Sequence, residues 1–328
     1  MRNIIPGILA ALASTCATLA RENYKRIVSD EFVRGYLSTQ GTFLSHTHGL
    51  HTALTGSLLT TPSALADGLI EQATASLSAL YNWTWHTTKH GDIQPFLRIS
   101  TGSAQYDGDA RDIDGRSNDS VEGETATLSV GYGLRWRPWP NTTISLGMNY
   151  GYLYTNNDYT YAPTSTPIGD GSTRNWFAHA ISSVTKLGFR QNVPLSANSW
   201  DKPASGKAVP CLTFTSNITS LSMFGAYGET NHQQRYVASA ILSNGLELTL
   251  HLSKTKKHVT LFAERTDILF DGRRSLGRDK CFYCAGVRYN QQRENDTVTN
   301  WLDTIHLSAS GIWGKDLNGW QFTIGLQF

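Results

Sequence analysis

Three histidines near the start of the chain are the first residues that could do chemistry. His46, His48 and His51 are followed by many serines and threonines. Hydrolases combine histidine with serine or paired acids, and clustered imidazoles also bind zinc. On a strand His46 and His48 would share a face, but no third metal ligand is evident nearby. We interpret the histidines as polar lumen or rim residues and expect no metal and no cofactor. A membrane-embedded hydrolase is the alternative hypothesis.

An aspartate-rich segment, 107–119, carries carboxylates of the kind that bind calcium. Its Asp112-Ile-Asp114-Gly115 stretch fails the EF-hand pattern, because Ala110 stands where an aspartate is needed. The sequence contains no Gly-x-Ser-x-Gly elbow, phosphate-binding loop or His-Glu-x-x-His motif. We therefore predict no intrinsic catalysis. A surface adhesin or receptor that acts through loops 107–122 and 157–173 is a further alternative.

The first residues have the organisation of a secretory signal peptide. A short basic start precedes an apolar stretch, and Thr18-Leu-Ala20 places small residues at positions −3 and −1 of a cleavage site. We predict that residues 1–20 are removed on export. An oxidising compartment favours a disulfide, for which Cys281 and Cys284 are the candidates, although the pairing with Cys211 stays open. A single C-x-x-C pair supplies too few ligands for zinc.

Composition excludes several classes of protein. The 328 residues carry 28 basic and 26 acidic side chains, aromatics reach 11%, charged residues only 16%, and mean hydropathy is −0.30. The chain is too aromatic to be disordered, and without a basic excess we expect no nucleic-acid partner. Beyond the signal peptide, no stretch of about 20 apolar residues could form a membrane helix.

The hydrophobic pattern has a period of two. Runs of about 10–15 residues recur, and tryptophan and tyrosine cluster at their ends, as in membrane-barrel strands bordered by aromatic girdles. Strands in lipid must close into a barrel, because no backbone hydrogen bond can stay unmet there. A soluble barrel or jelly roll is the alternative. The clearest run ends the chain and places on one face Trp320, Phe322, Ile324, Leu326 and Phe328.

We predict an all-β fold, a closed antiparallel transmembrane β-barrel over residues 41–328 with about twelve strands, in a range of ten to fourteen. Residues 21–40 form either a periplasmic arm or a helix in the lumen. The first strand pattern also suits a helix, and the eighth also suits a hairpin at Asn244-Gly245. The strands are predicted near residues 42–58, 72–86, 92–106, 123–137, 142–156, 174–190, 210–227, 234–253, 258–270, 280–290, 299–313 and 319–328.

Loop lengths suggest an orientation for this barrel. With both barrel ends in the periplasm, segments 107–122 and 157–173 become outer loops, whereas 137–141 and 254–257 become short inner turns. Segment 191–209 is longer than this scheme expects of an inner turn.

Charged and polar residues on the second face must avoid lipid, because an arginine or lysine at the membrane midplane costs about 2–4 kcal/mol. Two interpretations stay open: a structural network that fills the lumen, or a polar pathway for small solutes or for a passage during assembly. The residues predicted to face the lumen are Arg98, Arg135, Arg137, Glu247, His251, Glu264, Arg288 and His306.

The terminal phenylalanine and the alternating strand before it resemble the assembly signal of Gram-negative outer-membrane proteins. Within that class, Gly131-Tyr-Gly-Leu-Arg-Trp136 and Thr143-Ile-Ser-Leu-Gly-Met148 resemble strands of autotransporter translocator barrels. No β-helix repeats precede the barrel, so the chain resembles the solitary autotransporter-like barrels, which carry no passenger.

This resemblance implies a twelve-stranded barrel in the bacterial outer membrane that is able to hold a lumenal helix, and it carries over no catalytic residue. We expect contacts with membrane lipid and lipopolysaccharide, recognition of the C-terminal strand by the barrel assembly machinery, and a monomer.

Overall fold

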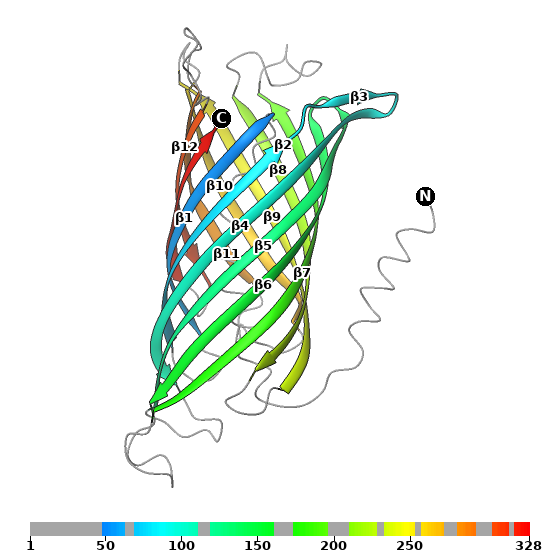
Figure 1. Ribbon diagram of the computed structural model, residues 1–328. Helices are drawn as coiled ribbons and strands as arrows, with labels where there is room; N and C mark the ends of the chain where they lie inside the picture. The colour runs from blue at the N-terminus through cyan, green and yellow to red at the C-terminus, as the bar shows by residue number, and fades with distance from the viewer. Residues whose placement is uncertain are drawn as a thin grey trace.

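Twelve long strands and one short strand form the part of the chain that the computed structural model describes, namely residues 48–62, 69–110, 119–160, 173–195, 210–227, 233–252, 257–271, 281–292, 304–314 and 318–328 (Figure 1). The strands are β1 (Gly49–Pro62), β2 (Leu69–Asn82), β3 (His86–Thr88), β4 (Gly91–Ala110), β5 (Asp119–Trp139), β6 (Thr142–Thr160), β7 (Thr173–Pro194), β8 (Cys211–Tyr227), β9 (Gln233–His251), β10 (Lys257–Asp271), β11 (Cys281–Gln292), β12 (Thr304–Trp313) and β13 (Asn318–Gln327).

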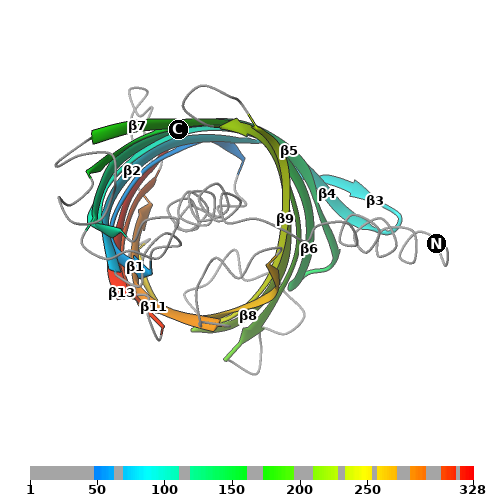
Figure 2. The same ribbon diagram turned by 90° about the horizontal axis from the view of Figure 1, so that it is seen from below.

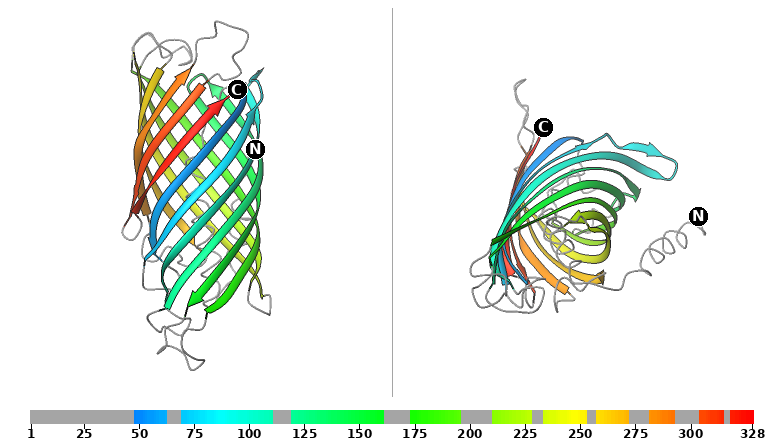
Figure 3. Two further views of the ribbon diagram at one scale, coloured as in Figure 1. Left: turned by 60° about the vertical axis from the view of Figure 1, so that its left-hand side comes forward. Right: turned by 60° about the horizontal axis from the view of Figure 1, so that its bottom comes forward.

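The long strands close into one antiparallel ring, as the view along the barrel shows (Figure 2). β2 pairs with β4, so the short β3 stands outside the ring order and pairs with the beginning of β4. Closure comes from β1 and β13, whose register places Leu54 opposite Ile324 (Figure 3). The closed twelve-stranded barrel predicted from the sequence is confirmed.

Two ambiguous predictions are decided by the strand register. β9 runs unbroken through Asn244, which pairs with Ser216 of β8 and Arg265 of β10, so the hairpin alternative at this position is wrong. The first pattern forms a strand rather than a helix, although it begins at Gly49. Residues 42–47 of the predicted first strand lie outside the described residues.

The two faces of the strands differ as a membrane barrel requires. On β13, Trp320, Phe322 and Ile324 are 62%, 54% and 53% exposed, whereas Gln321 and Thr323 between them are buried. Because side chains alternate along a strand, the apolar set faces outward toward lipid and the polar set faces the lumen. The predicted alternation of the last strand is therefore confirmed.

Strand lengths vary around the ring. A strand needs about 9–11 residues to cross the hydrocarbon layer, and β12 and β13 have 10 each. β5 has 21 and β7 has 22, so these strands continue beyond the apolar band. We call the end where β1 begins and β13 ends the terminal end, and the other end the distal end.

The short turn expected after residue 137 is present at the terminal end, since β5 ends at Trp139 and β6 begins at Thr142. β9 and β10 also join at this end, where the Leu252 amide donates to the Lys257 carbonyl at 3.0 Å. The two predicted outer loops begin later and end earlier than expected, because the strands beside them are longer: residues 107–110 pair with 119–122, and β6 continues to Thr160. Residues 111–118 and 161–172 lie outside the described residues. The signal peptide and residues 21–40 lie outside them entirely. In the described part of the chain, no helix is long and apolar enough to span a membrane.

Candidate functional site: the polar lumen

Hydroxyl side chains line much of the inner wall. They join neighbouring strands through side-chain hydrogen bonds between Thr55 and Thr323 (3.1 Å), Ser57 and Thr74 (2.5 Å), Ser100 and Ser129 (2.6 Å), and Ser243 and Thr266 (2.9 Å). Small hydroxyls leave space inside the barrel, and their cross-strand bonds satisfy polar groups that would otherwise need water. The inner wall is thus polar and carries short side chains. Short side chains let a twelve-stranded ring keep space in its interior.

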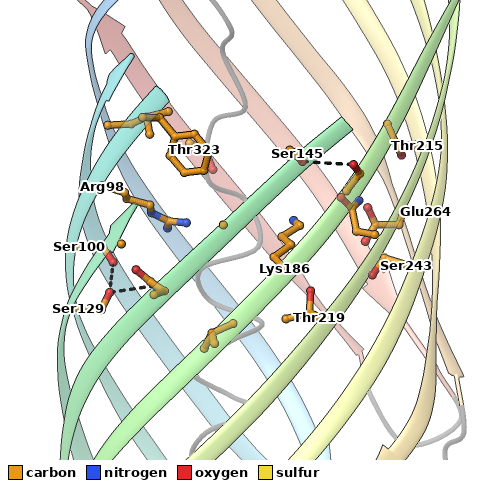
Figure 4. A pocket seen from close by; sticks show the side chains of 18 of the residues that line it. Arg98, Ser100, Ser129, Ser145, Lys186, Thr215, Thr219, Ser243, Glu264 and Thr323 are labelled. Carbon is orange, nitrogen blue, oxygen red and sulfur yellow. Dashed lines mark hydrogen bonds between the residues drawn. The ribbon is translucent and has the colours of Figure 1, made fainter. Parts of the chain in front are cut away.

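A cavity of about 340 Å³ lies within this wall (Figure 4). Its lining includes side chains from both halves of the ring, so the cavity belongs to the lumen rather than to a surface groove. The charged residues that line it are five basic and two acidic: Arg98, Arg135, Lys186, Arg190, Arg288, Glu247 and Glu264. Among the described residues, the lining of the lumen is therefore net cationic.

Glu247 on β9 is the centre of one charged cluster. Its Oε2 accepts a hydrogen bond from Arg190 Nη2 of β7 at 3.1 Å, and its Oε1 lies 3.6 Å from Arg288 Nη1 of β11. The Glu247 side chain is only 10% exposed, so the two guanidinium groups compensate for its removal from bulk water. This cluster ties three strands together on one side of the lumen.

A second group of charges faces across the cavity. Lys186 of β7 and Arg98 of β4 point into the lumen, and Glu264 of β10 lies on the wall beyond Lys186 (Figure 4). Lys186 interacts electrostatically with both of these residues, favourably with the carboxylate and unfavourably with the guanidinium. Glu264 also accepts a hydrogen bond from Thr266 Oγ1 at 3.3 Å. In the ring order Arg98 and Lys186 are three strands apart, and β10 with Glu264 is the strand opposite β4. A mobile ion in the cavity would therefore meet positive charge from β4 and β7 and negative charge from β10.

Arg135 on β5 is held differently, by neutral groups near the terminal end. Its Nη1 donates to Asn82 Oδ1 at 2.7 Å and to Gln94 Oε1 at 2.8 Å. The guanidinium carbon also lies 4.7 Å from the centre of the Phe96 ring. These contacts fix the orientation of a buried arginine without neutralising its charge.

The distal part of the lumen is less polar. Leu59 of β1, Phe282 of β11 and Ile312 of β12 pack together, with Cys284 against them. All belong to the inner face and come from the side of the ring where strands are short. The distal part of the inner wall on this side is therefore apolar, while the charged clusters lie along the remaining wall.

Most residues predicted to face the lumen do so. The cavity lining includes Arg98, Arg135, Glu247, Glu264, Arg288 and His306. His306 also hydrogen-bonds to Asn290 of the neighbouring strand. His251 belongs to β9, but its side chain lies outside the described residues.

Arg137 was predicted to face the lumen, and the structure corrects this prediction. Its guanidinium stacks over Trp85 at 3.8 Å from the ring centre, and it is absent from the cavity lining. The reason is that β5 continues past the point where β2 ends, so Arg137 pairs with Asp92 beside the short β3. Alternation still holds there, but the barrel wall no longer encloses a lumen.

Lys186 and Arg190 face the lumen although the sequence did not single them out. They belong to β7, where Ser182, Ser183 and Thr185 make both faces polar over several residues. Their spacing of four, which places both on one face of a strand, was the available signal.

The cysteines do not form the predicted disulfide. Cys211, Cys281 and Cys284 are all free. Cys281 and Cys284 belong to the same strand, three residues apart, so they point to opposite faces and their Cα atoms are about 10 Å apart at the usual rise. A disulfide needs Cα atoms within about 7 Å. Within β11 these two residues therefore cannot be joined.

The described histidines near the start do not converge. His51 is buried on the lumen face of β1, whereas His48 precedes the strand and its Nδ1 bonds to the Asn82 carbonyl oxygen at 3.0 Å. His46 lies outside the described residues. In the described ranges no three His, Cys, Asp or Glu side chains are grouped so as to hold a metal ion.

Solved structures with the same architecture are translocator units of autotransporters. The translocator domain of NalP from Neisseria meningitidis has a TM-score of 0.61 at 12% identity, covering 92% of this chain and 96% of that one. The transport unit of AIDA-I from Escherichia coli gives 0.58 at 11%, covering 91% and 97%. The β-domain of the Bordetella autotransporter BrkA gives 0.57 at 14%, covering 86% and 99%. At these identities the likeness concerns the fold.

The barrel and its polar lumen thus define the class, an outer-membrane β-barrel of the autotransporter type. No curated protein matches the chain. Residues 72–326 match the family described as the solitary outer membrane autotransporter beta-barrel domain, and the chain belongs to this family. The resemblance inferred from the terminal strand is thereby confirmed.

Proposed function

We propose that this barrel provides a polar passage for small solutes across the outer membrane and has no catalytic activity of its own. The observation that carries the proposal is the cavity inside the ring, bordered by hydroxyl groups and by charged side chains from opposite walls. A barrel whose only role was to anchor the chain could fill its interior with side chains and leave no cavity, as small barrels do.

The proposal includes the setting in which the barrel works. The chain would be exported by a signal peptide over residues 1–20 that is then cleaved. The barrel assembly machinery would recognise the last strand, from Trp320 to Phe328, and the terminal end would face the periplasm. The folded barrel would be a monomer surrounded by lipid and lipopolysaccharide, with its passage serving solutes rather than a passenger segment.

A swelling assay tests this proposal. Vesicles that contain the folded full-length protein are loaded with an impermeant polymer and diluted into isotonic solutions of small sugars or salts. Swelling shows that solutes enter through the barrel, and swelling at the rate of empty vesicles contradicts the proposal. Heat-modifiable mobility in a detergent gel first verifies that the reconstituted barrel is folded.

A matched pair of variants assigns the passage to the lumen. Ser129→Trp adds bulk to the inner face of β5, where Ser129 lines the cavity, while Tyr132→Trp adds bulk to the lipid-facing side of the same strand. Slower swelling for Ser129→Trp alone supports a lumenal route. Equal rates for the two variants would assign the permeation to leakage around the barrel.

A further inference from the structure

A short hairpin stands apart from the barrel at its terminal end. β3 extends sideways from this end in Figure 1 and lies outside the ring in the view along the barrel in Figure 2. We call residues 83–93 the foot: the segment after β2, the strand β3, and the turn that leads into β4. β3 pairs with the first residues of β4, with His86 opposite Ile93 and Thr88 opposite Gly91.

The foot is fixed to the barrel at several points. The Trp83 amide donates to the Pro95 carbonyl at 3.2 Å, and Gln94 Nε2 donates to the Trp83 carbonyl at 2.9 Å. On the other side, Trp136 Nε1 donates to the His90 carbonyl at 2.8 Å. Hydrogen bonds to β4 and β5 therefore fix the orientation of the foot relative to the barrel.

The turn at the tip of the foot is also well defined. Thr88 Oγ1 donates to the Gly91 carbonyl at 2.6 Å and accepts from the His90 amide at 3.2 Å. Gly91 has a φ of +111°, and a Cβ there would come within 2.3 Å of the Arg137 carbonyl oxygen. The conformation and the close approach both require glycine, so the tip is preformed rather than adaptable.

Exposed aromatic rings border the foot. Trp83 is 40% exposed and meets Tyr81 edge-on at 4.9 Å, while Trp136 and Trp139 at the end of β5 are also exposed. These rings continue the outward apolar face of β2 and β5 beyond the last aliphatic residues. Tryptophan and tyrosine favour the layer where hydrocarbon meets headgroups.

The tip adds one positive charge to this aromatic border. Lys89 is exposed between the imidazoles of His86 and His90, and Asp92, the acidic residue of the foot, lies opposite Arg137 of β5 and interacts with it electrostatically. An exposed lysine beside interfacial tryptophans complements the negative phosphates of lipid headgroups. Because the foot points along the membrane plane, its tip is placed over lipid and away from the lumen.

We propose that the foot binds the anionic phospholipid headgroups of the leaflet at the terminal end, with its tryptophans in the interface and Lys89 on the phosphates. This contact is separate from the solute passage. The proposed periplasmic orientation decides only which leaflet of the natural membrane the foot binds. In a symmetric bilayer both leaflets are the same, so the contact can be tested there without assuming that orientation.

Lysine acylation of the full-length folded protein tests the contact. Rates at Lys89 and Lys257 are measured by peptide mass spectrometry in detergent, in phosphatidylcholine nanodiscs and in nanodiscs that also contain phosphatidylglycerol. Lys257 begins β10 at the same end of the barrel and is the internal control. We expect the Lys89-to-Lys257 ratio to fall about fivefold in the anionic discs, the factor for about 1 kcal/mol per lysine at an anionic surface.

Two outcomes would overturn the proposal: a ratio that stays the same in all three media, or a fall of equal size in both kinds of disc. A matched pair keeps the test specific. Trp136→Phe removes the hydrogen bond to His90 and should weaken the protection of Lys89. Trp320→Phe, on the outward face of β13, should leave that protection intact.

Discussion

The Phe96 ring on β4 lies over the bare backbone of Gly133 on β5. A Cβ built on Gly133 would come within 2.3 Å of Phe96 Cζ and within 2.3 Å of the Leu146 carbonyl oxygen. The ring occupies space inside the barrel wall that any other residue at position 133 would fill. Arg135 stacks on the same ring, so this aromatic contact also positions one of the lumenal charges.

Gly133→Ala is therefore expected to destabilise the barrel by about 1–3 kcal/mol, because both the ring and the strand backbone must shift. The measurement is the temperature at which the folded band disappears in a heat-modifiability gel. Gly147, directly opposite on β6, is the matched control, since a Cβ there would stay 3.3 Å from the ring. Equal melting of Gly133→Ala and Gly147→Ala would contradict the packing described.

Glu247→Gln removes the carboxylate that Arg190 and Arg288 share. The expected loss is about 1–2 kcal/mol, below the value for a fully buried pair because both arginines are partly exposed. The same thermal measurement detects it. Glu122→Gln, on the exposed side of β5, is expected to change stability by less than about 0.5 kcal/mol. A loss of stability of similar size in both variants would contradict the role of Glu247 as the shared partner of the two arginines.

Cys281 and Cys284 are expected to remain thiols in the exported protein, because the strand holds them too far apart to join. Alkylation after unfolding without reductant, followed by peptide mapping, should find both side chains modified. A peptide joined between Cys281 and Cys284 would show that β11 does not form as described.

Closure of the ring predicts a specific cross-link. In a chain whose native cysteines are replaced by serine, Leu54→Cys with Ile324→Cys should form a disulfide on oxidation, because the two residues are directly paired across β1 and β13. Leu54→Cys with Leu307→Cys is the control. Leu307 pairs with the other side of Ile324, so it stands two strands away and should not cross-link. Cross-linking of both pairs to the same extent would contradict the register.

Alternation in the sequence was enough to predict the strands and most of the lumen. Trp320 to Phe328 alternates without interruption, because one face meets lipid and the other meets a polar interior. The C-x-x-C spacing also argues against a disulfide within the strand, because residues three apart on a predicted strand point to opposite faces. Because the sequence pattern also predicts a strand over residues 280–290, it indicates that Cys281 and Cys284 are poor disulfide partners.

Other features depended on tertiary geometry. By its place in the alternation of β5, Arg137 should face the lumen. No local sequence pattern shows that β5 extends beyond the end of β2 and lies there beside the hairpin of β3 and β4. The foot could not be predicted either, since the three residues of β3 are too few to give a periodic hydrophobic pattern. Lys186 was missed because β7 is polar on both faces near it, so the amplitude of the alternation is low.

The central claim is that the polar lumen conducts, and ion selectivity in a planar bilayer tests it most directly. Five basic and two acidic side chains line the described cavity, so the account predicts open-channel conductance and a reversal potential in a salt gradient that favours anions. Lys186→Glu should move that potential toward cations, while Lys89→Glu, outside the lumen, should not. A silent bilayer, or a cation preference that Lys186→Glu leaves unchanged, would contradict the account.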